Sequence, residues 1–223
     1  MTIAALNVIA AANGLQLSDE QLGKLSTYAE LLRTKNQVVN LISRKDEENV
    51  LSKHILHSLT LVFPHIDLAG ISGEAKVFDL GTGGGLPGIP IKIARPDISL
   101  VLCDSIGKKI AATEAMAKAL SLDKTQAIIA RAELLTKQKE HKRKYDVVIT
   151  RAVAPLDELL NWSRELLKSG GILLSLKGGD LTEETEKAER LKFIKSIEVK
   201  KLSLVGYDEF MKEEKKIVRV RII

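Results

Sequence analysis

The most constraining feature of this sequence is a glycine-rich segment that directly follows a short apolar run. Residues 77–80 form the apolar run, and residues 81–88 read Gly-Thr-Gly-Gly-Gly-Leu-Pro-Gly. A loop with so few side chains lets backbone N–H groups approach a bulky ligand, and the helix after it adds its positive end. Pro87 suits the first turn of that helix, which we expect to end near Arg95. The segment therefore predicts the strand, loop and helix that open a nucleotide-type α/β unit.

Two acids near this loop discriminate between two classes of cofactor. In a dinucleotide fold the first glycine follows the strand directly, whereas here Asp79 precedes Gly81 and is expected to face the ligand. A carboxylate there repels a pyrophosphate and suits a cationic amino acid portion. Asp104 ends the next apolar run, where an acid grips ribose hydroxyls. We interpret the pattern, with Gly81 and Gly83 in the loop, as an S-adenosylmethionine site rather than a dinucleotide site.

The rest of the chain after Lys76 alternates between apolar runs and helical patterns. Strands are expected at 98–103, 125–130, 145–150 and 171–176, with helices at 88–95, 108–120 and 181–190. Such continuous apolar strands are typical of a parallel sheet covered on both faces. The runs at 197–204 and 217–222 predict an antiparallel pair at the end. We expect an α/β fold over 67–223, a Rossmann-like class I S-adenosylmethionine-dependent methyltransferase domain with a mostly parallel sheet and an antiparallel C-terminal strand.

The first 66 residues carry no cofactor motif and predict an N-terminal helical extension. Residues 18–21 have the sequence of a capping box, and apolar side chains follow at helical spacing from Leu22 to Leu32. A third helix is expected from about Glu48 toward Pro64. The expected division is therefore an extension at 1–66 and a methyltransferase domain at 67–223.

Composition narrows the range of partners. The 223 residues have a formal net charge of +5, which favours a polyanionic partner, and only 4% are aromatic, which argues against an RNA binder that works by stacking bases on exposed rings. A single cysteine fits a reducing compartment, and no apolar stretch reaches the ~20 residues of a membrane span. We expect a cytoplasmic protein with no membrane partner.

Several single residues have both a functional and a structural interpretation. Arg151, after the fourth expected strand, either holds a ligand or caps the strand end in solvent. Cys103 lies in an apolar strand and is interpreted as a buried structural thiol, which disfavours methylation through a cysteine adduct. His54 and His57 lack a third ligand at a recognisable spacing, so we predict no metal site and place both at the surface or facing the substrate.

Two basic clusters, at 137–144 and 195–201, are either RNA contacts or solvated faces. If they form a rim that binds phosphates, shape and charge supply the RNA affinity.

The motifs together resemble those of one protein family. They are residues 79–90, Arg95-Pro96, Asp104-Ser105, 131–133, 150–156 and 176–178, with Asn40-Leu41 and 54–59 in the extension. Over nearly the whole chain the sequence resembles the ribosomal small-subunit methyltransferase G family, also called glucose-inhibited division protein B. His57 is a departure, because the family usually has Asp at this position, so a role for that acid does not transfer.

The resemblance implies an enzyme that uses S-adenosylmethionine to make 7-methylguanosine in bacterial small-subunit (16S) ribosomal RNA, naked or within the 30S subunit or an assembly intermediate. By motif position it implies cofactor contacts at Gly81, Leu86, Ala132-Glu133 and Arg151. Lys177 is expected to hold guanine O6 or a nearby phosphate. No metal is implied.

The expected chemistry needs no general base, because guanine N7 carries a lone pair and no proton at neutral pH. The segment after the fourth strand reads Thr-Arg-Ala-Val-Ala-Pro at 150–155. It is unlike the loop used for exocyclic amino groups, in which an acid or Asn is followed by Pro-Pro and an aromatic residue. We therefore expect no catalytic side chain. A small-molecule methyltransferase and a non-catalytic RNA-binding assembly factor are the alternatives, and the complete glycine loop with Asp104 and Arg151 argues against the second.

Overall fold

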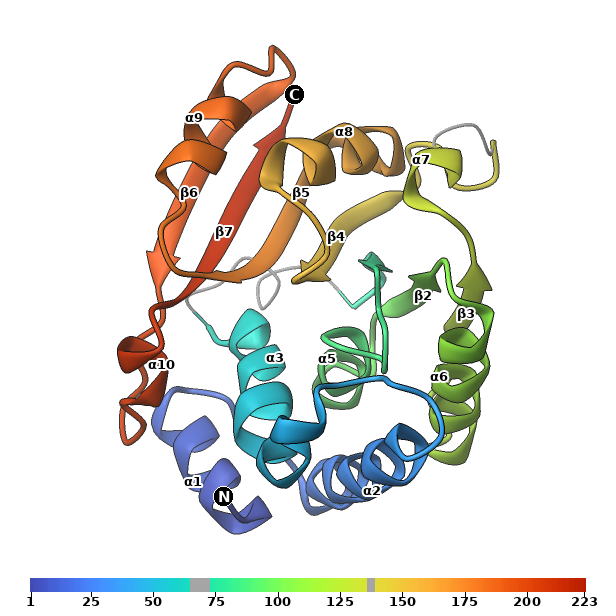
Figure 1. The fold of residues 1–223 in the computed structure, drawn as a ribbon, viewed down its shortest axis with the longest axis vertical. Coiled ribbons are helices and arrows are strands. Elements are labelled where there is room, and N and C mark those ends of the chain that lie inside the picture. Colours follow the sequence, from blue (N-terminus) through green and yellow to red (C-terminus); the bar gives the residue numbers. More distant parts are fainter. Residues whose placement is uncertain (65–72, 136–138) are drawn as a thin grey trace.

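The structure is a computed structural model, and it describes residues 1–64, 73–135 and 139–223. Its centre is a seven-stranded sheet in the order β3-β2-β1-β4-β5-β7-β6 (Figure 1). The strands are β1 (Lys76–Leu80), β2 (Ser99–Asp104), β3 (Thr125–Ile129), β4 (Tyr145–Arg151), β5 (Leu167–Gly178), β6 (Ile194–Lys201) and β7 (Lys215–Ile222). The five strands from β3 to β5 are parallel, whereas β7 runs antiparallel to both β5 and β6. The expected mostly parallel sheet with an antiparallel C-terminal strand is confirmed.

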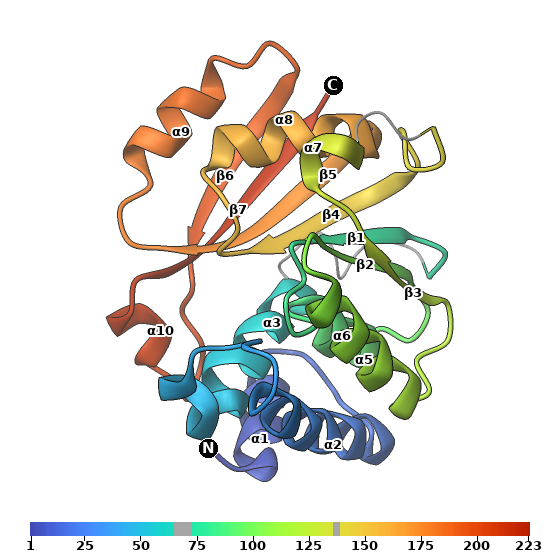
Figure 2. The same ribbon diagram turned by 45° about the vertical axis from the view of Figure 1, so that its right-hand side comes forward.

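Side chains that alternate along the strands divide the interior into two apolar layers. Val77 belongs to a core shared with helices of one face, and the next residue, Phe78, belongs to a second core on the opposite face. The first layer contains α1 (Ile3–Ala12), α2 (Asp19–Asn36), α3 (His57–Leu59), α5 (Gly88–Ala94) and α6 (Gly107–Ala119). The second contains α7 (Ala132–Leu135), α8 (Leu156–Leu166) and α9 (Thr182–Glu189). Figure 2 shows these helices on the two sides of the sheet, so the fold has three layers.

The N-terminal extension packs on the first layer and shares its core. Leu6 of α1 and Leu25 and Tyr28 of α2 are fully buried in the same cluster as Ile89 of α5. The expected capping box at the start of α2 is present, with Ser18 accepting from the Gln21 N–H. The expected boundary between residues 66 and 67 lies outside the described residues.

The third expected helix is less regular than its sequence pattern predicts. Residues 44–62 form a 3₁₀ segment η1 (Arg44–Asn49), a π-helical segment η2 (Val50–Leu56), the short α3 and a second 3₁₀ turn η3 (Thr60–Val62). Among the described residues, no helix is long and apolar enough to cross a membrane.

One loop between the last two strands reaches back to the extension. It carries α10 (Glu209–Lys212), whose Phe210 is buried and lies with its ring centroid 5.1 Å from that of His57. Asn13, at the end of α1, both donates to the Val205 carbonyl and accepts from the Val205 N–H, at 3.1 and 2.9 Å. The C-terminal strands and the N-terminal extension are thus joined across the length of the chain.

Candidate active site

Asp79 organises the glycine loop from inside the protein. Its side chain is fully buried, and Oδ2 accepts from the Thr82 hydroxyl at 2.7 Å and from the Gly88 N–H at 2.9 Å. Burial raises the pKa of this carboxyl to about 7, and the hydrogen bonds from Thr82 and Gly88 oppose the shift. The expectation that Asp79 faces the ligand is therefore corrected, because the carboxyl closes the loop onto the start of α5. Its Oδ1 atom has no hydrogen-bond partner among the described residues.

Asp104 connects the glycine loop to the end of the neighbouring strand. Its Oδ2 accepts from the Gly83 N–H at 3.0 Å, and its Oδ1 accepts from the Ile106 N–H at 2.9 Å. The Gly83 carbonyl is in turn held by the Thr113 hydroxyl of α6 at 2.8 Å. The acid after β2 is thus a fixed part of the loop, with 9% of its surface exposed at the site.

Two glycines in the loop leave space that a side chain would fill. Gly81 has φ +74°, and a Cβ there would lie 2.5 Å from Val153 Cγ2. A Cβ on Gly84 would lie 2.8 Å from Leu32 Cδ1 of the extension, and the Tyr28 hydroxyl of the same helix donates to the Gly84 carbonyl at 2.9 Å. The extension therefore supports the loop directly from below.

A pocket of about 480 Å³ lies at the carboxyl ends of the parallel strands, where ligands bind in sheets of this kind. Its walls include Gly81, Asp104, Ile106, Ala132, Glu133 and Trp162. The acid, Asp104, suits a ribose, and the small residues and the indole on the walls suit an adenine. Gly81, where a Cβ would intrude, leaves room for a close-lying amino acid portion. The donor set therefore fits S-adenosylmethionine.

Six of the seven predicted cofactor residues, all except Arg151, divide into three groups by position. Four of them line this pocket: Gly81, Asp104, Ala132 and Glu133. Gly83 lies beside it, with its N–H held by Asp104. Leu86 is 4% exposed and belongs to the apolar core, so the structure does not bring its side chain into the pocket.

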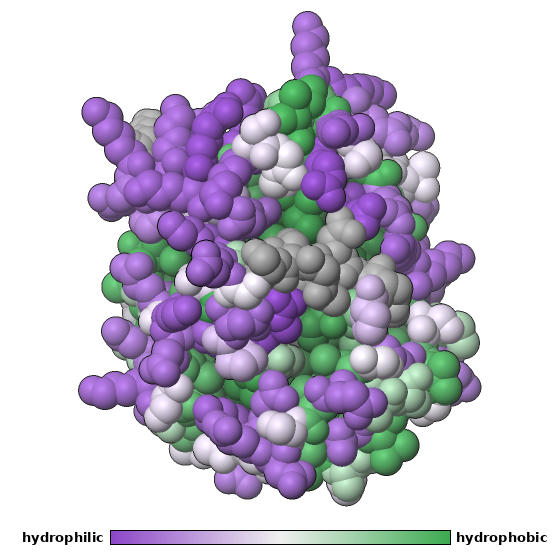
Figure 3. Space-filling view, turned by 180° about the vertical axis from the view of Figure 1, so that it is seen from behind, coloured by the Kyte–Doolittle hydropathy of each residue, from purple (hydrophilic) through white to green (hydrophobic). Residues whose placement is uncertain are grey.

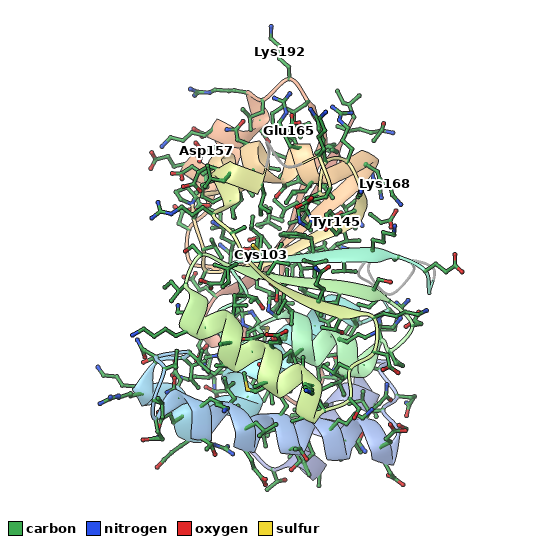
Figure 4. The ribbon with its side chains drawn as sticks, turned by 90° about the vertical axis from the view of Figure 1, so that its right-hand side faces the viewer. Cys103, Tyr145, Asp157, Glu165, Lys168 and Lys192 are labelled. Atoms are coloured by element: carbon green, nitrogen blue, oxygen red, sulfur yellow. The ribbon has the colours of Figure 1, made fainter. Side chains whose placement is uncertain are left out.

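Cys103 is at the centre of the molecule, at the end of β2 (Figure 4). Its side chain is buried, and Sγ donates to the Ala130 carbonyl at 3.5 Å. Burial raises the pKa of this thiol to about 12, so it stays protonated at neutral pH. The predicted burial of this thiol is confirmed, and Cys103 is also one of the residues that line the cofactor pocket.

A second pocket, of about 650 Å³, adjoins the first, and Ala152 lines both. Arg151 and Lys177 line this second pocket, together with Lys53 and His54 of the extension and Lys215 of β7. Two carboxylates, Asp46 and Glu213, also line it. Four distant parts of the chain therefore contribute to one cation-rich cavity beside the cofactor pocket.

Arg151, at the end of β4, is held by two residues of η2. Its Nη2 lies 2.7 Å from His54 Nδ1, and its Nη1 donates to the Lys53 carbonyl at 3.4 Å. Burial lowers the pKa of the guanidinium from its ordinary value, and it remains a cation, while burial and the nearby Arg151 charge lower the pKa of His54 to about 3. Arg151 is thus neither a solvent-exposed strand cap nor a lining residue of the cofactor pocket.

Of the two positions expected for His54 and His57, the surface is excluded because both side chains are buried, whereas a position that faces the substrate stays a prediction. Their exposed fractions are 6% and 5%, and burial lowers the pKa of His57 as well. Both line the second pocket. Among the residues that the structure describes, no group of three or more His, Cys, Asp or Glu side chains has the arrangement of a metal site.

Lys177 is placed in the second pocket with partners of its own. Its Nζ donates to Glu184 Oε2 at 2.5 Å and to the Ala154 carbonyl at 2.8 Å, and its side chain is 10% exposed. A substrate contact by this lysine therefore has to compete with, or share, the Glu184 carboxylate.

Sequence reasoning missed four charged residues of this second pocket: Asp46, Lys53, Glu213 and Lys215. They lie in polar stretches that read as ordinary solvated faces, and no fixed spacing relates them to the glycine loop. The only sequence signal was a basic residue, Lys215, at the start of the last strand. The order of the strands alone does not place that end of β7 beside the extension.

The described part of the first basic cluster, residues 139–144, lies at the amino ends of the parallel strands, away from the site. Residues 139–144 precede the amino end of β4, whereas both pockets lie at carboxyl ends. Lys142 is also paired with Glu165 at 3.4 Å. Figure 3 shows that the back of the molecule carries broad hydrophilic areas.

Comparison with known proteins gives one consistent family. Residues 21–214 match the model of the family described as rRNA small subunit methyltransferase G. The chain is 44% identical over 185 residues to the ribosomal RNA small subunit methyltransferase G of Chlorobium luteolum, covering 83% of this chain and 74% of that protein. It is 45% identical over 176 residues to the protein of the same name from Chlorobaculum tepidum, covering 79% and 77%.

Solved structures support the fold. The chain superimposes with a TM-score of 0.57 on a SAM-dependent O-methyltransferase from Thermotoga maritima, at 12% sequence identity and covering 79% of this chain and 69% of that one. At such low identity the likeness concerns the fold, which is that of class I S-adenosylmethionine-dependent methyltransferases.

Proposed function

The chain belongs to the rRNA small subunit methyltransferase G family, and from this premise we propose that it transfers the methyl group of S-adenosylmethionine to N7 of a guanosine in small-subunit ribosomal RNA. The observation that carries the proposal is the junction of two pockets at Ala152. One pocket suits the cofactor, and the other presents cations to an RNA nucleotide. A methyl group passes between two ligands only if their sites meet.

The cofactor pocket supplies binding and orientation. Asp104 would accept hydrogen bonds from the ribose hydroxyls, Ala132 and Glu133 would lie against the adenine, and the loop at Gly81 would let the backbone approach the amino acid portion. When bound, S-adenosylmethionine supplies an electrophilic methyl group on a sulfonium. The buried Asp79 keeps the glycine loop closed onto the start of α5 through the Thr82 hydroxyl and the Gly88 N–H.

The second pocket orders the target nucleotide. Arg151 donates to acceptors of the guanine or its phosphate, because a guanidinium has five N–H donors and the two bonds to the extension use only part of them. Lys177, beside Glu184, contributes a further donor to guanine O6 or a phosphate. Holding the nitrogen, the methyl carbon and the sulfur in line is then the main source of rate acceleration.

No proton leaves guanine N7 in this transfer, and the titration behaviour of nearby side chains suits such a step. The pKa of His54 is about 3 and that of Cys103 about 12, so neither changes charge between pH 6 and 9. Asp79, with a pKa of about 7, changes charge within this window in the free protein. Because Asp79 lines neither pocket, this change of charge takes no direct part in the methyl transfer.

The test measures methyl transfer in single turnover with saturating cofactor and RNA. The rate should be nearly flat from about pH 6 to 9, because no group must accept a proton. Cys103→Ser should retain the activity. A tenfold rise of the rate through neutral pH would contradict the base-free step.

The form of the RNA substrate is tested by radiolabel transfer to naked small-subunit RNA, small subunits and whole ribosomes. We propose that RNA within the small subunit or an assembly intermediate is the substrate, since the cation-rich pocket has a volume of only about 650 Å³ and the basic cluster at 139–144 lies at the amino end of β4, away from it. Labelling of naked RNA alone would contradict this part. Calorimetry should show S-adenosylmethionine binding without added metal, weakened about tenfold in Asp104→Ala, because charge-assisted hydrogen bonds of ~1–3 kcal/mol are lost.

A further inference from the structure

We propose that His54 is a positioning residue: its neutral Nδ1 atom accepts from Arg151, so that the N-terminal extension sets the orientation of the guanidinium in the second pocket. The inference rests on the proposed function for the role of Arg151, and on the described contacts for the role of His54. It makes the extension part of the active site's construction rather than an added module.

The chemistry of the pair assigns the histidine tautomer. A guanidinium carries donors and no acceptor, and Arg151 Nη2 lies 2.7 Å from His54 Nδ1. Nδ1 must therefore be unprotonated and accept the bond, which leaves the ring proton on Nε2. A protonated imidazolium would instead place two cations in hydrogen-bond contact inside the protein.

A second acceptor on the same turn fixes the plane of the guanidinium. The Lys53 carbonyl, one residue before His54, accepts from Nη1 at 3.4 Å. Both acceptors come from η2, a π-helical segment, and such segments occur often at functional sites. Arg151, at the end of β4, is thus gripped by two consecutive residues from another part of the chain.

The surroundings of His54 favour the same tautomer. Asp46 Oδ2 lies 3.9 Å from Nε2, which is too long for a hydrogen bond but attracts the Nε2 proton. Asp46 Oδ1 accepts from Lys53 Nζ at 3.0 Å. The charged groups that affect His54 are Arg151 of β4, Asp46 of η1, Lys53 of η2 and Lys215 of β7, and three of these four are cations. The three cations oppose protonation of the ring, whereas Asp46 favours it.

The decisive variants keep or remove the acceptor at one position. In His54→Asn the amide oxygen can occupy the place of Nδ1 and accept from Arg151, whereas His54→Leu fills similar space without an acceptor. We expect His54→Leu to lower the single-turnover methyl-transfer rate about 10- to 100-fold, since small misplacements of a positioned group cost this much. His54→Asn should restore the rate to within about fivefold of the wild type.

A matched control separates positioning from loss of stability. Leu59→Ala removes buried packing from the same helical run without touching Arg151, so it should lower the melting temperature and leave the rate of the folded protein unchanged. Equal rates for His54→Leu and His54→Asn, or a rate loss in Leu59→Ala as large as in His54→Leu, would overturn the proposal.

A spectroscopic readout tests the pair without any substrate. Long-range ¹H–¹⁵N NMR of the histidine rings in the full chain should show His54 with its proton on Nε2 and an unprotonated, hydrogen-bonded Nδ1 at pH 7. Arg151→Gln should shift the Nδ1 resonance. A proton on Nδ1, or a charged ring at pH 7, would refute the assignment. If instead the wild type fails to methylate small-subunit RNA, the proposed function fails while this NMR result still decides the role of His54.

Discussion

The two pockets that meet at Ala152 are built in opposite ways. The cofactor pocket is made by segments that directly follow β1, β2, β3 and β4 of the parallel sheet, and its key acid, Asp104, is 21 residues from the loop N–H that it holds. The second pocket draws on η1, η2, β4, β5 and β7, and Arg151 meets His54 across 97 residues. One pocket follows from the local order of strand and loop, whereas the other exists only once the extension and the last strand have docked.

The difference shows which part of the fold is free to set substrate choice. A glycine loop and a ribose-binding acid can serve enzymes of this fold that methylate different acceptors, because the cofactor is the same. The second pocket is lined by side chains from the extension, which packs on one face of the sheet, and from β7, which lies beyond the parallel strands. We infer that specificity for the methyl acceptor lies in these additions.

The largest expected effect comes from removing the positive charge of Arg151, which joins β4 to the N-terminal extension through His54. Arg151→Gln should lower the single-turnover rate about 100-fold or more, because it leaves His54 Nδ1 without its donor and the nucleotide without a cation. Cofactor affinity should change by less than about threefold, because Arg151 does not line that pocket. Rapid-quench kinetics and calorimetry give the two quantities. A loss of cofactor binding equal to the loss of rate would assign Arg151 to the cofactor pocket instead. Arg164→Gln, on the outer helix α8, is the matched control.

The next effect should be confined to the cofactor pocket. Gly81→Ala places a Cβ 2.5 Å from Val153 Cγ2 at a φ of +74°, so we expect cofactor affinity to fall about 30-fold. Val153→Ala in the same chain removes the clash and should recover part of the affinity, leaving the strain of the left-handed backbone, which costs ~1 kcal/mol. Calorimetry of the single and double variants measures both. If the double variant bound as weakly as Gly81→Ala, contact with Val153 would not be the cause.

Acid should change the free energy of unfolding with opposite signs through His54 and through Asp79. The folded pKa of His54 is about 3 against 6.5 for an ordinary histidine, so the unfolded chain binds more protons below pH 6.5 and stability falls as pH drops toward 3. Its contribution is on the order of 1 kcal/mol per pH unit. Asp79, with a folded pKa of about 7, is stabilising when protonated, and this contribution is lost as pH rises from about 4 to 7. Urea unfolding from pH 4 to 7 should show a weaker loss of stability on acidification in His54→Asn than in the wild type. Parallel curves would contradict the buried neutral histidine.

The smallest effect is expected from the basic cluster at the far edge of the sheet. Charge reversal at Lys142, Arg143 and Lys144 together should change RNA affinity less than about twofold at a fixed salt concentration, because these residues precede β4 on the side away from both pockets. Reversal at Lys53 and Lys215 should weaken binding and reduce its salt dependence, since each phosphate contact adds about 0.7 to 0.9 to the slope. Filter binding across a salt series distinguishes the two. Strong weakening by the triple variant would move the RNA path to the far edge.

Much of the sheet was predictable because its signals are local. Each parallel strand reads as a short apolar run, and β1 and β2 begin or end within one residue of the expected positions. The strand expected at 171–176 instead begins at Leu167, because pairing with β4 extends it beyond its apolar stretch. The helix expected from Glu48 is instead a run of 3₁₀ and π segments around the short α3, and the π segment carries the two residues, Lys53 and His54, that contact Arg151.

What the sequence by itself determined is the chemistry that depends on short spacings: the strand, the glycine loop, the acid one strand later, and hence a cofactor of the S-adenosylmethionine type. The resemblance of its motifs identified the family in the same way. Only the tertiary structure decided that Asp79 points inward to the Gly88 N–H, that His54 and His57 are buried, and that Arg151 belongs to the second pocket. The physical reason is that a backbone loop is specified by its own residues, whereas the burial and partners of a charged side chain depend on which distant segments pack against it.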